Sequence, residues 1–266
     1  MTIRNAKLVQ SRDNALFKKM QHFSKSSHAR RKHSLTLLDG PHLIESFHSV
    51  GYPIEILALN DSGAAKAELC NLFDKVEARH KIRLSDRLFQ DIAAVGTPTG
   101  IMALVDTPRT QSTPDTQTDS VLLEDIQDAG NLGSILRSAA AAGVRQVLLS
   151  RGCVFAWSPK VLRAGMGAHF TLQIFEDWPL EEFLRHFEGS AIAMEVEAVE
   201  SIFDLRVKES VAWLFGNEGA GLSAPLAAQA RYRVHIPMSG QVESLNVAAA
   251  AAVCLFERLR QTQCAN

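Results

Sequence analysis

The second half of the chain repeats one local pattern three times: an apolar strand-like run, a polar turn rich in Gly, Asn, Asp or Ser, and helical sequence. The three blocks are LLEDIQDAGNLGSILRSAAAAGV (Leu122–Val144), FGNEGAGLS (Phe215–Ser223) and HIPMSGQVESLNVAAAAAV (His235–Val253). Glycine in such a turn lets the main chain approach a small molecule closely, and the turn exposes backbone N–H groups to it. An open α/β sheet builds its binding site from loops at the ends of its strands, so the three turns predict one shared site.

The alternation of strand-like and helical stretches predicts the fold class of this half, which is α/β with a parallel sheet covered by helices on both faces. The predicted strands are Val121–Ile126, Gln146–Leu149, Thr171–Phe175, Ala191–Met194, Val211–Phe215 and Tyr232–Ile236. A Rossmann-type oxidoreductase that binds NAD(P) has the same alternation. However, no G-x-G-x-x-G sequence follows the first strand and the chain has no P-loop lysine, which argues against that class.

A change of composition predicts two domains. The segment Thr107–Ser120 has no aliphatic residue and is rich in Pro, Thr, Ser and Gln, as is typical of a linker. It separates a domain over residues 1–106 from a domain over residues 121–266. The first domain is predicted to be a smaller α/β unit, with helices at Asn14–Phe23, Pro41–Val50, Ala64–Phe73 and Asp86–Ala94 and strands at Leu35–Leu38, Ile54–Leu59, Ile82–Leu84 and Ile101–Val105.

The positive charge of the chain is concentrated at its start. Residues 1–33 carry nine Lys or Arg and a single acid, Asp13, although the formal net charge of the whole chain is −1. Such a local excess is an electrostatic footprint for a polyanion. The alternative is a solvated amphipathic start to the fold with no ligand of its own.

Composition also limits where the protein acts and what it binds. No apolar run reaches the roughly 18 residues of a membrane span, and Met1–Gln10 has no signal-peptide core. We therefore expect a cytoplasmic protein, or one of an organelle matrix, without a membrane partner. The four cysteines are Cys70, Cys153, Cys254 and Cys264. They form no C-x-x-C pair and have no nearby histidine cluster, which predicts free thiols and no metal site.

The three blocks resemble the three motifs of the SpoU (TrmH) family of RNA ribose 2′-O-methyltransferases, which belongs to the SPOUT superfamily. The matching residues are Asn131 and Arg137 in the first block, Gly216-Asn217-Glu218-Gly219 with Gly221-Leu222 in the second, and Ile236-Pro237-Met238, Gly240 and Ser244-Leu245-Asn246-Val247 in the third. They occur in family order across about the last 145 residues. One departure is Ala248, where many relatives carry Ser.

The resemblance implies features that the hydrophobic periodicity of the sequence cannot reveal. It implies a deep trefoil knot in the C-terminal domain, a homodimer, and S-adenosyl-L-methionine as the methyl donor. Two further features, the Asp39-Gly40 turn and the Thr97–Ile101 segment, resemble the substrate-binding domain that precedes many SpoU domains. With an RNA substrate implied, the basic start of the chain becomes an RNA-binding candidate, with Arg30, Arg31 and Lys32 as the predicted contacts.

The resemblance also implies the site residues. The implied catalytic set is Asn131, Arg137, Glu218, Ser244 and Asn246, and the implied donor pocket is formed by Gly216, Ile236 and Leu245 with Met238 and Gly240 shaping its loop. The family arginine approaches the RNA phosphate and has been proposed to help remove the hydroxyl proton. Because arginine is a poor base in isolation, we expect Arg137 first to clamp phosphate through its bidentate fork.

Each of these residues also has a local structural interpretation that the sequence leaves open. Arg137 could pair with Asp128 on the surface, and Asn131 could cap the N-terminus of a helix beginning near Leu132. Glu218 could stabilise the N-terminus of a helix starting near Leu222. Ser244 and Asn246 precede the final helix and could cap it.

The sequence is thus interpreted as a two-domain, S-adenosylmethionine-dependent RNA 2′-O-methyltransferase. Ribosomal RNA is the favoured substrate, because a separate substrate-binding domain is common in relatives that act on it, and transfer RNA stays open. A base methyltransferase of the wider knotted superfamily and a catalytically silent RNA-binding assembly factor on the same fold stay open as well.

Overall fold

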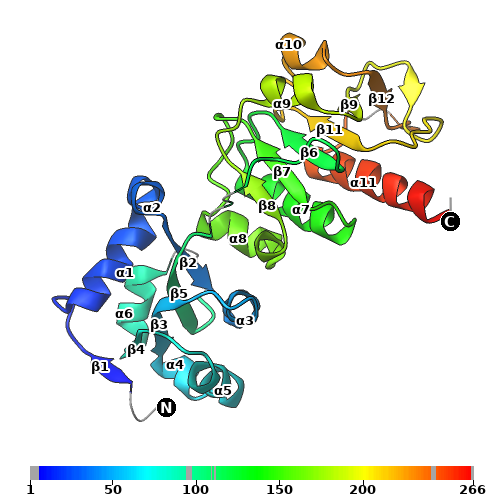
Figure 1. Cartoon of the computed structure of the whole chain (residues 1–266). Helices are drawn as coiled ribbons and strands as arrows, with labels where there is room; N and C mark the ends of the chain where they lie inside the picture. The colour runs from blue at the N-terminus through cyan, green and yellow to red at the C-terminus, as the bar shows by residue number, and fades with distance from the viewer. Residues whose placement is uncertain (1–5, 94–97, 109, 111, 241–243, 265–266) are drawn as a thin grey trace. The chain divides into compact units, whose positions relative to one another are not determined.

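The computed structural model describes residues 6–93, 98–108, 110, 112–240 and 244–264 (Figure 1). Predictions that involve Arg4, Ala94, Thr97 or Arg109 lie outside these residues. By its contacts the chain divides into two compact units, of which the first comprises Met1–Pro108 and Trp157–Phe170 and the second Arg109–Ala156 and Thr171–Asn266. None of the helices among the described residues is long and apolar enough to cross a membrane.

The first unit is built on a five-stranded mixed sheet in the order β1-β4-β3-β5-β2. Strand β3 runs parallel to β4 and antiparallel to β5, and β5 is antiparallel to β2. The strands are β1 (Lys7–Val9), β2 (Leu35–Asp39), β3 (Ile54–Asn60), β4 (His80–Leu84) and β5 (Ile101–Asp106). Four of them match predicted strands, and β1 was missed because its three residues carry no period that a sequence can reveal.

Helices lie on both faces of this sheet. They are α1 (Ala15–Lys25), α2 (Ser27–His33), α3 (Pro41–Ser49), α4 (Asp61–Ala64), α5 (Ala67–Lys75) and α6 (Asp86–Ile92), together with α8 (Pro159–Gly165) from later in the chain. Phe17 and Met20 of α1 and Phe89 of α6 are fully buried in one core with side chains of the sheet. Helix α1 begins where the sequence predicts, because the Asn14 side chain accepts hydrogen bonds from the first free backbone N–H groups.

The second unit contains a seven-stranded sheet in the order β10-β12-β9-β11-β6-β7-β8, and every recorded pairing is parallel. The strands are β6 (Ser120–Leu123), β7 (Gln146–Leu149), β8 (Gln173–Phe175), β9 (Ser190–Met194), β10 (Glu200–Ser201), β11 (Val211–Phe215) and β12 (Tyr232–His235). The prediction of a parallel α/β sheet is confirmed. The first strand ends at Leu123 rather than Ile126, so Glu124 and Asp125 already belong to the loop beyond it.

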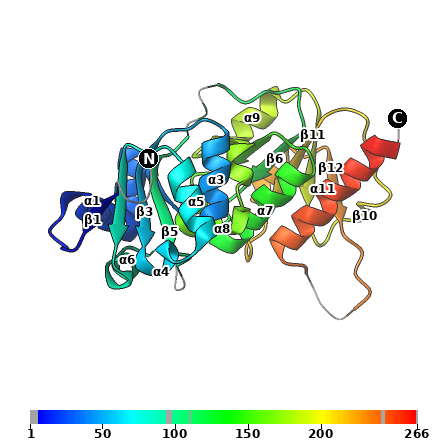
Figure 2. The same ribbon diagram turned by 90° about the horizontal axis from the view of Figure 1, so that it is seen from below.

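Helices cover both faces of this sheet as well (Figures 1 and 2). On one face α7 (Ala129–Ala141) packs beside the C-terminal helix α11 (Val247–Cys264). On the other face α9 (Leu180–His186) and α10 (Ala224–Ala227) cover a core that includes Leu122 and Leu214. Successive side chains of a strand point to opposite faces, so the apolar residues of a strand can contribute to the core on both faces of the sheet.

Candidate functional site

Three loops from distant parts of the sequence meet at the carboxyl ends of β6, β11 and β12. Asn131 of α7 lies between the other two loops. Its Nδ2 donates to Glu218 Oε1 at 3.0 Å, and its Oδ1 accepts from Asn246 Nδ2 at 2.8 Å. The structure therefore joins three of the five predicted catalytic side chains, Asn131, Glu218 and Asn246, in one hydrogen-bonded chain, which we call the Asn131 cluster.

The start of α7 explains how Asn131 and Glu218 are held. Asp128 is the N-cap of α7, and its carboxylate accepts from Asn131 N at 2.8 Å. Glu218 accepts from the backbone N–H groups of Gln127 at 3.3 Å and Asp128 at 3.1 Å. The interpretation of Asn131 as an N-cap is therefore wrong, since it lies in the first turn. Glu218 is indeed placed at a helix N-terminus, but at that of α7 rather than the helix after Leu222.

The hydrogen bonds at Glu218 have an electrostatic consequence. Partial burial acts to raise the pKa of Glu218, but the hydrogen bonds from Asn131 and from backbone N–H groups outweigh it and hold the pKa below the ordinary value. Glu218 is therefore a carboxylate at neutral pH. In that form it can only accept hydrogen bonds, which fixes the orientation of the Asn131 amide.

The turn after β11 requires glycine at its first position. A Cβ on Gly216 would lie 2.2 Å from the carbonyl carbon of Gly221, and Gly221 itself has φ of +69°. Asn217 closes the turn, because its Oδ1 accepts from the N–H groups of Gly219 and Ala220, both at 2.9 Å. Its Nδ2 donates to the Asp125 carbonyl at 2.8 Å and so ties this turn to the loop after β6. Asn217 was not among the predicted site residues, although its place beside Gly216 in the motif could have indicated it.

The final helix is capped from the same cluster. Asn246 Oδ1 accepts from Ala248 N at 2.9 Å, which confirms the prediction that Asn246 caps α11 and leaves its Nδ2 free for Asn131. Ser244 makes no such bond and instead lines the pocket described below.

Arg137 is an exposed residue of α7, and its side chain forms no hydrogen bond or ion pair with any residue the structure describes. The alternative in which Arg137 pairs with Asp128 is therefore wrong, and no hydrogen bond joins Arg137 to the Asn131 cluster.

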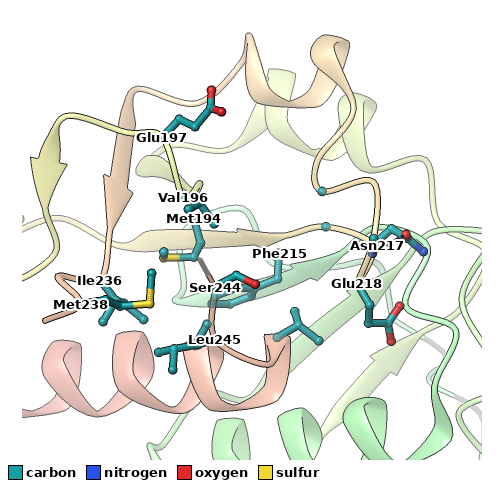
Figure 3. A pocket seen from close by; sticks show the side chains of 15 residues that line it. Met194, Val196, Glu197, Phe215, Asn217, Glu218, Ile236, Met238, Ser244 and Leu245 are labelled. Carbon is teal, nitrogen blue, oxygen red and sulfur yellow. Dashed lines mark hydrogen bonds between the residues drawn. The ribbon is translucent and has the colours of Figure 1, made fainter. Parts of the chain in front are cut away.

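A pocket of about 490 Å³ opens beside this cluster (Figure 3). It is lined by Met194, Val196, Glu197, Phe215, Gly216, Asn217, Glu218, Gly219, Gly221, Ile236, Met238, Ser244, Leu245, Val247 and Ala250. Four of the five predicted donor-pocket residues, Gly216, Ile236, Met238 and Leu245, therefore share one cavity. Gly240 is exposed and does not line it, and residues 241–243 lie outside the described part of the chain.

The pocket combines apolar walls with a polar end. Figure 3 shows Ile236 and Met238 side by side, with Asn217 and Glu218 at the opposite end. Met238 and Leu245 are 39 % and 42 % exposed, so sizeable apolar side chains remain available to a ligand. A volume of this size, and a lining that combines apolar side chains with a few polar groups, are typical of small-molecule and cofactor sites. Met194 and Glu197 were missed: Met194 is the last residue of β9 and Glu197 lies just after it, and this part of the sequence carries no motif.

The basic start of the chain is partly structural. Arg30 is only 7 % exposed, and its Nη1 donates to the carbonyls of Phe23 and Ser24 at the end of α1. Burial also lowers the pKa of its guanidinium. The prediction that Arg30 contacts RNA does not fit this position and is corrected: Arg30 joins α1 to α2. Arg31 and Lys32, the next residues of α2, are exposed.

No group of three or more His, Cys, Asp or Glu side chains suited to a metal ion occurs among the described residues. Cys70, Cys153 and Cys254 are free thiols. Burial raises the pKa of Cys254 to about 12, so this thiol is unreactive at neutral pH.

Comparison with protein-family models gives a match over residues 120–256 to the SpoU rRNA methylase family, which covers the sheet, the pocket and the Asn131 cluster. The chain belongs to this family. It is therefore an RNA methyltransferase, and S-adenosyl-L-methionine is the cofactor of the SpoU methylases.

Similar proteins span nearly the whole length of this SpoU methylase. A tRNA/rRNA methyltransferase of Synechocystis, itself uncharacterised, is 33 % identical over 95 % of this chain and 93 % of its own. The 23S rRNA guanosine 2′-O-methyltransferase RlmP of Bacillus subtilis is 30 % identical over 85 % of this chain and 89 % of its own.

Solved structures show the same fold. The crystal structure of an RNA 2′-O ribose methyltransferase matches with a TM-score of 0.84 at 27 % identity, over 96 % of this chain and 99 % of the other. The SpoU methyltransferase AviRb of Streptomyces viridochromogenes, solved with S-adenosylmethionine, matches with a TM-score of 0.83 at 26 % identity, over 94 % and 98 % of the two chains.

Proposed function

We propose that this SpoU methylase transfers the methyl group of S-adenosylmethionine to a ribose 2′-hydroxyl of ribosomal RNA. The observation that carries the proposal is the Asn131 cluster at the edge of the 490 Å³ pocket, which places polar groups where a donor and a hydroxyl acceptor can meet. The similar proteins support the choice of ribose and ribosomal RNA, since RlmP of Bacillus subtilis is a 23S rRNA 2′-O-methyltransferase.

The pocket residues fit the proposed donor. Gly216 lines the pocket with its main chain, and Ile236 and Leu245 offer apolar surface to an adenine ring. The Glu197 carboxylate at the rim can accept hydrogen bonds from ribose hydroxyls or from an ammonium group. When bound, S-adenosylmethionine supplies a methyl group that is already activated by its sulfonium charge.

The residues of this chain then have to align the acceptor hydroxyl. A bound donor would supply an activated methyl group, and holding the ribose oxygen in line with it would account for much of the rate. Glu218 orients Asn131, and Asn131 and Asn246 together present amide groups to the ribose. Ser244 adds a hydroxyl on the pocket wall.

Arg137 is assigned to the RNA rather than to the donor. Its side chain is exposed, has no partner among the described residues, and does not line the pocket. A guanidinium in that state is available to a phosphate through two parallel hydrogen bonds, whereas its high pKa makes it a poor base. We propose that Arg137 clamps the phosphate next to the reacting ribose.

The first unit is proposed to bind the RNA. Its support is the exposed pair Arg31 and Lys32 on α2, with Lys7 and Lys25 also exposed. Along the sequence, the proposed division is residues 1–106 for RNA binding, 107–120 as the linker and 121–266 for the transfer, except that Trp157–Phe170 packs with the first unit.

Three finer features complete the proposal. Likeness to family structures over nearly the whole chain supports a deep trefoil knot in the second unit. The 47 % exposed Phe256 on α11 supports a homodimer that buries this helix. The proposed location is the cytoplasm, because ribosomal RNA is modified and assembled there.

The substrate class is tested by supplying labelled S-adenosylmethionine with separated ribosomal and transfer RNA that lack their native modifications. We expect label in ribosomal RNA only. Label confined to transfer RNA would contradict the proposed substrate, and donor binding without transfer to either pool would favour the catalytically silent assembly factor.

A further inference from the structure

A second cavity, of about 400 Å³, opens in the second unit at the carboxyl ends of β6, β7 and β8. We call it the Trp178 cavity, and it is lined by Glu124, Ser150, Trp178, Pro179, Leu180, Glu181, Glu182, Arg185 and Leu226. None of these residues belongs to the predicted site. Ligands of open α/β sheets bind outside the carboxyl ends of the strands, so the position itself is one where a ligand is expected.

The tryptophan of this cavity is presented by an unusual loop. Asp177, just before it, has φ of +54°, a left-handed conformation that a non-glycine residue rarely adopts. Trp178 N donates to the Leu149 carbonyl at 2.9 Å, and its ring packs edge-on against Phe175 with 5.5 Å between centroids. Trp157 and Trp213 are 5 % and 2 % exposed, whereas Trp178 is only half-buried. Its indole surface is thus the one that a stacking partner can reach.

The charges around Trp178 indicate which partner fits. Arg185 on α9 has no hydrogen bond or ion pair with any residue that the structure describes, and the same holds for the carboxylates of Glu181 and Glu182. Glu124 Oε2 accepts from Ser223 N at 2.7 Å and adds a further negative charge. Carboxylates repel phosphate and accept from N–H donors, so the carboxylates of this cavity suit a base better than a phosphate.

Hydrogen bonds through Asp125 and Asn217 link the Trp178 cavity to the loops that hold the Asn131 cluster. Ser150 Oγ donates to the Asp125 carboxylate at 2.6 Å, and Asp125 N donates back to it at 2.9 Å. The Asp125 carbonyl accepts from Asn217 Nδ2, which belongs to the turn that carries Glu218. The loop from Glu124 to Asp128 therefore borders the Trp178 cavity and also holds the cluster.

We propose that the Trp178 cavity binds a guanine base turned out of the RNA strand whose ribose is methylated, an inference that rests on the proposed function. Unpaired RNA bases are recognised by stacking on aromatic rings and by hydrogen bonds to their edges. Guanine alone presents two neighbouring donors, N1–H and the 2-amino group, which match the two oxygens of a carboxylate of Glu181 or Glu182. Arg185, which also lines the cavity, takes the adjoining phosphate.

The test uses the full chain and short single-stranded uridine oligonucleotides that carry one central guanosine, adenosine, inosine or no purine, with affinity measured by fluorescence anisotropy. The guanosine oligonucleotide should bind about tenfold more tightly than the all-uridine one, in line with the stacking of one base. Trp178→Ala should abolish this difference, and Trp178→Phe should keep most of it. The wild-type protein should bind the guanosine oligonucleotide more tightly than the inosine one, because inosine lacks the 2-amino group. The double variant Glu181→Gln/Glu182→Gln should bind the two equally.

Phe203→Ala, which removes a 45 % exposed aromatic outside the cavity, is the matched control and should leave all affinities unchanged. Equal affinity for guanosine and all-uridine oligonucleotides, or an unchanged preference in Trp178→Ala, would overturn the inference. Oligonucleotide binding is measured without S-adenosylmethionine, so a failed guanosine preference does not bear on the proposed function. Failure of the proposed function would instead appear as absent S-adenosylmethionine binding or absent methyl transfer by the wild-type protein.

Discussion

Both units place helices on both faces of a β-sheet, which is mixed in the first and parallel in the second, but they use the carboxyl ends of their strands differently. In the first unit Asp39 and Asn60, the last residues of β2 and β3, are 5 % and 7 % exposed, and their side chains bond within the unit. Asn60 Oδ1 accepts from Gly63 N at 2.7 Å, and Asp39 accepts from Thr99 at 3.2 Å. In the second unit the polar side chains of the Asn131 cluster bond to one another across loops and remain accessible beside a pocket.

Helices packed on both faces of a sheet therefore do not by themselves make a reactive site. A polar side chain that satisfies the backbone of its own turn stabilises the fold. The same side chain becomes available for chemistry when other loops hold it in place and its remaining groups face solvent. In the proposed function the first unit binds RNA through exposed positive charges, and the second positions the groups that take part in methyl transfer. Variants in each unit should therefore have different effects.

The largest effect is expected for Arg137→Ala. Methyl transfer should fall by about a hundredfold or more, the scale seen when a group that stabilises charge at the reacting centre is removed. Donor binding and thermal stability should hardly change, because the side chain is exposed and has no partner among the described residues. Single-turnover transfer and calorimetric titration with S-adenosylmethionine measure the two quantities, and a folded variant that no longer binds the donor would refute the RNA-side role.

Gly216→Ala should damage the second unit alone. The added Cβ would meet the backbone of Gly221, so the turn must shift, at a cost of about 1–3 kcal/mol in the free energy of unfolding. Donor binding should be lost while RNA binding through the first unit is retained. Gly143→Ala, at a position where a Cβ meets nothing within 4 Å but φ is +83°, controls for backbone strain alone.

Arg31→Ala combined with Lys32→Ala should weaken RNA binding roughly tenfold and lower the salt-dependence slope by about two. Donor binding should not change. Arg30→Ala provides the contrast, because loss of its bonds to the α1 carbonyls should destabilise the first unit instead. An unchanged salt slope in the double variant would exclude the exposed α2 residues from the RNA interface.

The smallest effect concerns α11. The pKa of Glu257 is lowered to about 2, mainly by the hydrogen bond from Arg260. The Glu257 carboxylate therefore stabilises the folded state at pH values above its ordinary pKa near 4.5. That contribution is lost as the pH falls from about 4.5 towards 2. Glu257→Gln should cost about 1 kcal/mol at neutral pH, since Arg260 is largely solvent-exposed, and almost nothing at pH 2. Urea titrations at both pH values check this, and equal losses at both would contradict it.

The sequence predicted well those features that depend on local period and on ordered motifs. The strands of the second unit, their parallel sheet and a shared site at the strand ends follow from apolar runs ended by Gly- and Asn-rich turns, and the resemblance to the SpoU motifs placed Asn131, Glu218 and Asn246 at that site. The resemblance to the SpoU motifs likewise grouped Gly216, Ile236, Met238 and Leu245, which line a common pocket.

Features that depend on long-range packing could not be predicted in this way. Three consecutive basic residues look alike in sequence, yet Arg30 faces the α1 carbonyls while Arg31 and Lys32 face solvent. Helix α8 packs with the first unit although it lies far along the chain, and no local signal shows this. The Trp178 cavity arises from three strand ends that the sequence separates by many residues.

Methylation of a ribose oxygen is tested by identifying the methylated nucleoside. RNA labelled by the wild-type protein from S-adenosylmethionine would be digested to nucleosides and separated by chromatography, with Arg137→Ala as the parallel control. We predict label only in a 2′-O-methylnucleoside, at a position resistant to alkaline cleavage, and about a hundredfold less label or none with the variant. Label in a base-methylated nucleoside would show that the acceptor is not the ribose oxygen.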